Sequence, residues 1–258
     1  MTVELRTHAA RDRAAAESDR IERKVAAFES FERRVRDVSA EAAGRAGSSA
    51  PAGPSTGGAL AVGTPTDGAA TDPVREAFEE TVLALADADA TAEAMADELS
   101  PDLAAALSPA GAGFAPGLKT RLLERVGERQ SECRLLADAV AAERDRLGAL
   151  GDDLDDVTAW LAEADETSLL ELGFEELRAR HDQLAAHRET CDELARERQR
   201  SLDDIRYGGA IGIREREVLD LLYADFPVDH PVLADIAALD SLLDDCQRAV
   251  RRHLCARV

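Results

Sequence analysis

The chain has 258 residues, of which 52 are acidic and 31 are Lys or Arg, so its formal net charge is -21. Hydrophobic residues make up 45% of the sequence but aromatic residues only 3%, which favours a thin core of Leu, Val and Ala between paired helices over an enzyme fold around a deep pocket. No hydrophobic leader follows Met1 and no apolar run is long enough to cross a bilayer, so we expect a cytoplasmic protein without membrane contact.

The first part of the chain predicts a helix followed by a linker. Residues 1–42 form the N-terminal helix, with Arg and Glu over most of its surface. Its apolar side comprises Ile21, Val25, Phe28, Val35 and Val38. Residues 43–71 are mostly Gly, Ala, Ser, Pro and Thr. Because that composition buries too little apolar area to offset the entropy of ordering, it predicts a disordered linker.

Residues 72–115 predict short helices. Asp72-Pro73 opens the first one with a capping residue and an early proline, and Ser100-Pro101 opens another. The run at 108–117 is a Gly- and Pro-containing loop. The inner face of the first helices comprises Phe78, Val82, Leu85 and Met95.

The strongest pattern in the sequence is the heptad spacing of residues 116–206, which predicts a long antiparallel coiled-coil hairpin. Steps of three and four residues alternate along a first arm, which is interrupted by charge at Arg129 and Glu143. The apolar positions of this arm are Leu122, Val126, Cys133, Leu136, Val140, Leu147, Leu150, Leu154, Val157, Leu161 and Ala164. The second arm is less apolar and comprises Leu170, Phe174, Leu177, His181, Leu184, Arg188, Cys191, Ala195, Arg198, Leu202 and Ile205.

The segment 164–168 carries the turn chemistry between the two arms. Ser168 and Glu171 fit a capping box for the second helix. The glycines of the first arm, Gly148 and Gly151 among them, weaken it and make a kink or break conceivable there.

A short turn centred on residue 167 also predicts a register. Glu143 then lies opposite Cys191 and one layer from Arg188, close enough for an ion pair across the hairpin. The same register pairs Leu161 with Phe174, Val157 with Leu177, Leu154 with His181, Leu150 with Leu184, and Leu136 with Arg198.

Residues 207–258 predict a C-terminal helical pair. A helix at about 213–225 precedes the turn FPVDHP, in which Asp229 caps and Pro231 opens the final helix. The apolar stripe of that helix comprises Val232, Ile236, Leu239, Leu243, Cys246 and Val250.

The residues with ligand chemistry do not form a convincing site. Cys246, His253 and Cys255 cluster near the C-terminus, and His187 lies one helical turn from Cys191; four such ligands could hold zinc, but the CxxC spacing of zinc sites is absent. Cys133, Cys191 and Cys246 instead occupy apolar positions, where cysteine acts as a small hydrophobe. His181 is interpreted as a polar residue of the hairpin interior. We therefore expect no catalytic, cofactor-binding or metal-binding residue, no cofactor or small-molecule substrate, and no enzymatic activity.

The string REREVLDLL at 214–222 resembles the start of a LuxR-type helix-turn-helix, which implies a DNA-associated regulator using residues 213–250. The turn FPVDHP replaces the glycine turn of that motif. The following helix carries Asp235, Asp240, Asp244 and Asp245, which repel phosphate. DNA binding is therefore the alternative, and nucleic acid is not the expected partner.

Three segments, at 171–184, 191–202 and 226–254, resemble an uncharacterised acidic coiled-coil family of halophilic archaea, a domain of unknown function. The resemblance implies no activity. Acidic excess and a near absence of lysine, with only Lys24 and Lys119, are typical of proteins from salt-accumulating cells. Together these features predict a non-enzymatic protein–protein interaction or scaffold module of a halophile, which binds a protein partner or itself through its helices.

Overall fold

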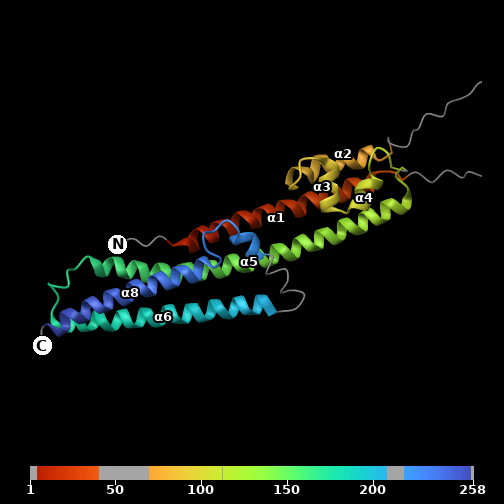
Figure 1. The fold of residues 1–258 in the computed structure, drawn as a ribbon. Helices are drawn as coiled ribbons and strands as arrows, with labels where there is room; N and C mark the ends of the chain where they lie inside the picture. Colours follow the sequence, from red (N-terminus) through yellow and green to blue (C-terminus); the bar gives the residue numbers. More distant parts are fainter. Residues whose placement is uncertain (1–4, 41–69, 112, 208–217, 257–258) are drawn as a thin grey trace, which may run out of the picture. The chain divides into compact units, whose positions relative to one another are not determined.

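The computed structural model describes residues 5–40, 70–111, 113–207 and 218–256, and over these residues the protein is all-α, as predicted, with no strand. The predicted linker at 43–71 falls outside them except for its last two residues. Residues 218–223 are also helical. The helices are α1 (Arg6–Asp37), α2 (Asp72–Thr81), η1 (Leu83–Leu85), α3 (Thr91–Glu98), α4 (Pro101–Ala106), α5 (Pro116–Asp165), α6 (Phe174–Tyr207) and α8 (Pro231–Cys255) (Figure 1). Within this part of the chain, no helix has the length and apolar character that crossing a membrane requires.

The contacts of the chain divide it into two compact units. One comprises residues 20–135, and the other comprises residues 1–19 together with 136–258. Helices α1 and α5 contribute residues to both units. The two units are described separately below.

The unit of residues 20–135 has a core of phenylalanine and aliphatic side chains. Phe31 of α1 and Phe78 of α2 meet edge to face, with their ring centroids 5.5 Å apart. The other large, fully buried residues of this unit are Phe28, Met95, Leu99, Leu107, Phe114 and Leu122. Ser100 caps α4 as predicted, because its hydroxyl accepts a hydrogen bond from the Leu103 amide at 3.2 Å. The prediction was correct for the buried residues Phe78, Val82 and Met95 and for the cap at Ser100. It was wrong for Leu85, which is only half-buried, and for the cap at Asp72, because Asp72 is already the first residue of α2 and the residue before it makes no side-chain cap.

A buried carboxylate joins three helices of this unit. Glu98 of α3 forms ion pairs with Lys24 of α1 and with Arg129 of α5, whose Nη2 lies 3.0 Å away. Burial opposes the charge on Arg129, but its hydrogen bond to Glu132 and the charge of Glu98 outweigh burial and raise its pKa. The charge that interrupts the apolar pattern at Arg129 therefore has a partner from another helix, which satisfies it inside the unit.

The second unit contains the C-terminal part of α5 together with α6 and α8 (Figure 1). Helix α5 is continuous through Gly148 and Gly151, so the chain has no break there. Its apolar positions are largely buried, in agreement with the heptad pattern: Val140, Leu147, Leu150, Leu154 and Val157. Leu177, Leu184, Cys191 and Leu202 of α6 are buried as well.

Helix α8 runs antiparallel to α6. Arg188 of α6 binds Asp240 at 2.9 Å and Asp244 at 2.8 Å, and Gln247 approaches the His181 carbonyl at 3.4 Å. Thus residues later in α8 lie against residues earlier in α6. The hairpin of α5 and α6 therefore packs with a third long helix and is not a free two-helix arm.

The predicted register of the hairpin was wrong. Glu143 of α5 pairs with Arg198 of α6, at 2.6 Å, and not with Arg188. This partner lies seven residues, one heptad, beyond Cys191, the residue predicted to face Glu143. Arg188 still has ion-pair partners in the actual register, because Asp240 and Asp244 of α8 provide carboxylates. The sequence argument assumed that these two charges had only each other to neutralise them.

A longer turn explains the shift. Helix α5 ends at Asp165 and α6 begins at Phe174, so the predicted capping box at Ser168 and Glu171 was wrong. The residue before α6 is Gly173, whose amide donates a 2.6 Å hydrogen bond to the Glu176 carboxylate. The extra residues carry Leu170 and Phe174 out of the hairpin interior, where they had been predicted to lie.

The start of α1 is fixed to α8 by a buried carboxylate. Asp235 accepts hydrogen bonds from the Thr7 amide at 2.7 Å and the Thr7 hydroxyl at 2.9 Å, and it pairs with Arg6 at 3.2 Å. An acceptor at this position satisfies an otherwise unpaired amide in the first turn of the helix. At α8 itself the residue before the helix is His230, which makes no side-chain cap, so the predicted cap by Asp229 was wrong.

Candidate interaction surface

A buried polar cluster of three residues lies inside the second unit. Arg198 donates two hydrogen bonds to Glu143, of 2.6 and 3.1 Å, and the Tyr223 hydroxyl donates one of 2.6 Å to the same carboxylate. The side chains of Glu143 and Arg198 are each 2% exposed. Burial, followed by the charge of Glu143, raises the pKa of Tyr223 far above its usual range.

This cluster is fully hydrogen-bonded and closed to solvent, so it is a structural element. A bidentate arginine–carboxylate pair is geometrically specific, and breaking it leaves a buried charge without a partner. It therefore favours a single register of α5 against α6 and ties the helical segment 218–223 to both. Sequence reasoning noted the charge of Glu143 and the position of Arg198 but missed Tyr223, which no spacing pattern connects to them.

The candidate metal ligands do not come together. Cys191 is buried, and burial raises the pKa of its thiol to about 11. The ring of His187 stacks against Trp160 with a centroid distance of 4.5 Å. Cys246 is half-buried and Cys255 is exposed. In the described part of the chain, no group of three His, Cys, Asp or Glu side chains has the arrangement of a metal site.

The segment proposed for DNA binding is only partly described. Residues 213–217 lie outside the described ranges, and 218–250 include the helical segment 218–223 and most of α8. Two of the aspartates that would face phosphate, Asp240 and Asp244, bind Arg188 of α6. Asp235 binds the start of α1. These acidic groups therefore have structural roles within the unit.

The most distinctive surface lies where the turn between α5 and α6 meets the last turns of α8. An apolar groove of about 270 Å³ opens there. Its walls come from α5, the turn, α6 and α8: Trp160, Leu161, Ala164, Asp165, Thr167, Ser168, Leu169, Arg180, Leu184, Cys246, Ala249 and Val250. The groove thus lies entirely within one unit.

Two large apolar side chains project from the same turn. Leu170 is 75% exposed and Phe174 is 45% exposed. Among the described residues the only other exposed large hydrophobic residue is Leu135, elsewhere on α5. Exposed apolar side chains that gather beside an apolar groove are typical of interaction sites, whereas single scattered ones need no explanation.

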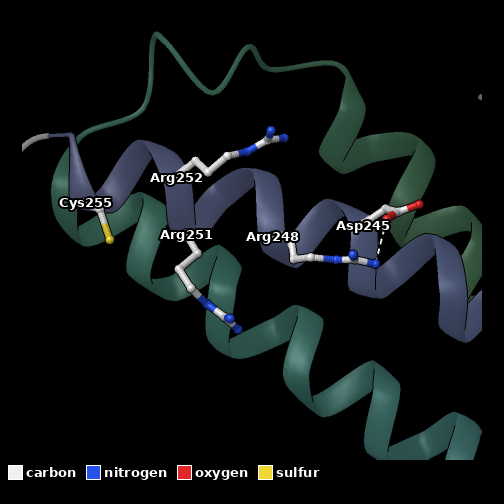
Figure 2. Close-up of a pocket in the computed structure, with 5 residues that line it drawn as sticks. All are labelled: Asp245, Arg248, Arg251, Arg252 and Cys255. Carbon is white, nitrogen blue, oxygen red and sulfur yellow. Dashed lines mark ion pairs between the residues drawn. The ribbon is translucent and has the colours of Figure 1, made fainter.

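The end of α8 and the turn between α5 and α6 carry opposite charges. Figure 2 shows the end of α8, where Arg248, Arg251 and Arg252 extend around an open hollow of about 680 Å³ that Asp245 and Cys255 also line. Arg248 is neutralised by Asp244 and Asp245, at 2.6 and 2.9 Å. The turn carries the opposite sign, since residues 165–176 include five acidic residues and no basic one.

We call this region the turn-end surface. It consists of the groove and of the turn, which carries acidic residues and the exposed Leu170, up to Phe174 at the start of α6. The arginines at 248–252 line a separate hollow on another face of α8. The turn-end surface has apolar and acidic parts.

Comparison with known proteins gives one match. The family model described as "Domain of unknown function (DUF7260)" matches residues 5–247. No curated protein and no solved structure is similar to the chain. The match spans α1, the short helices, α5 and α6 completely and α8 up to residue 247.

Proposed function

The chain belongs to the DUF7260 family, and we propose that it is a non-enzymatic protein–protein interaction or scaffold module of a halophile. The observation that carries the proposal is the turn-end surface, where the turn that lines an apolar groove also carries the exposed Leu170 and leads to the exposed Phe174 at the start of α6. Burying such side chains against a partner is favourable by about 25 cal/mol per Å² of apolar area. An isolated chain gains nothing from exposing them.

The interior charges support the same proposal. The buried ion pairs Glu143–Arg198, Lys24–Glu98 and Arg129–Glu98 all serve packing between helices. An active site more often keeps a titratable group accessible in a cleft. The long helices thus form a framework that presents a surface.

The halophilic part of the proposal is supported by composition alone. The chain has a formal net charge of -21 and only two lysines. At molar salt the Debye length is about 3 Å, so repulsion between surface carboxylates is largely screened.

An affinity experiment tests the interaction. The full chain, tagged, is used to capture proteins from a halophile extract at molar KCl, alongside Leu170→Ser/Phe174→Ser and a matched control, Leu135→Ser. Wild type and control should retain a polypeptide that the double variant loses. Equal retention by all three chains, or no retention by any, contradicts a role for this surface.

A further inference from the structure

We draw no further inference here: the strongest candidate, the apolar groove between the turn that joins α5 to α6 and the last turns of α8, carries none because nothing in the structure shows what covers it.

Discussion

The guanidinium of Arg198 binds the carboxylate of Glu143 through two hydrogen bonds in the interior of the second unit, and Tyr223 adds a third to the same carboxylate. This contact joins α5, α6 and the helical segment 218–223. Removing either charged member leaves the other buried without its main counter-charge; Glu143 would keep only Tyr223 at 2.6 Å and Arg146 at 3.6 Å.

Glu143→Ala or Arg198→Ala should each lower the free energy of unfolding by about 3–5 kcal/mol, the usual cost of breaking a buried pair. The double variant Glu143→Leu/Arg198→Met should recover much of that loss, because it removes both charges and fills the space. Urea denaturation of the full chain at molar KCl measures these values. Additive losses in the double variant would show that the two side chains do not act as a pair.

Much of this architecture was predictable from the sequence. The apolar positions of α5, the all-α class and the cap at Ser100 followed from spacing and capping chemistry. The ion-pair partner of each buried charge could not be predicted in the same way. Heptad spacing shows which face of a helix is buried, but it does not show whether that face meets one helix or two.

The error in the predicted register of α5 against α6 shows what heptad spacing does not determine. The segment before Gly173 has residues suited to capping, so a shorter turn was equally compatible with local sequence. Only packing distinguishes the two turns, because Arg188 binds Asp240 and Asp244 of α8 in the actual register. The turn-end surface was missed for the same reason, since Leu170 looked like one more apolar heptad position.

Glycines inside α5 provide a test of helix continuity. A methyl group added at Gly127 or Gly148 meets no atom within 4 Å, so alanine there gains helix propensity without a clash. Each substitution should raise the free energy of unfolding by about 0.5–1 kcal/mol. Gly113→Ala is the contrast, because Gly113 has φ = 90° and should lose stability. Thermal unfolding of the three variants measures the difference, and destabilisation at 127 and 148 would mean that α5 bends there.

The cysteines should differ in reactivity and in their effect on stability at alkaline pH. Burial raises the pKa of the Cys191 thiol from about 9 to about 11. The protonated thiol is thus favoured in the folded state, so its contribution is full below pH 9 and is lost as the pH rises toward 11. A thiol reagent at pH 8 should modify the exposed Cys255 quickly and Cys191 only on unfolding. Mass spectrometry of peptides after timed labelling distinguishes the two, and equal rates would contradict the burial of Cys191.

The salt concentration should control how much of the chain is folded. With a net charge of -21, removing salt restores repulsion between surface carboxylates, so helicity should fall as KCl decreases from molar to tens of millimolar. Circular dichroism at 222 nm follows the change, with sucrose as a non-ionic control at the same osmolality. Helicity that stays constant over the range would refute the halophilic interpretation.

The claim that this protein works through its turn-end surface is tested most directly by hydrogen–deuterium exchange. The full chain is measured alone at molar KCl and again in the complex isolated from the high-salt extract. Peptides covering 160–184 and 245–255 should exchange more slowly in the complex, while those covering 91–107 should not change. Protection confined to any other part of the chain, or no protection at all, would contradict the account.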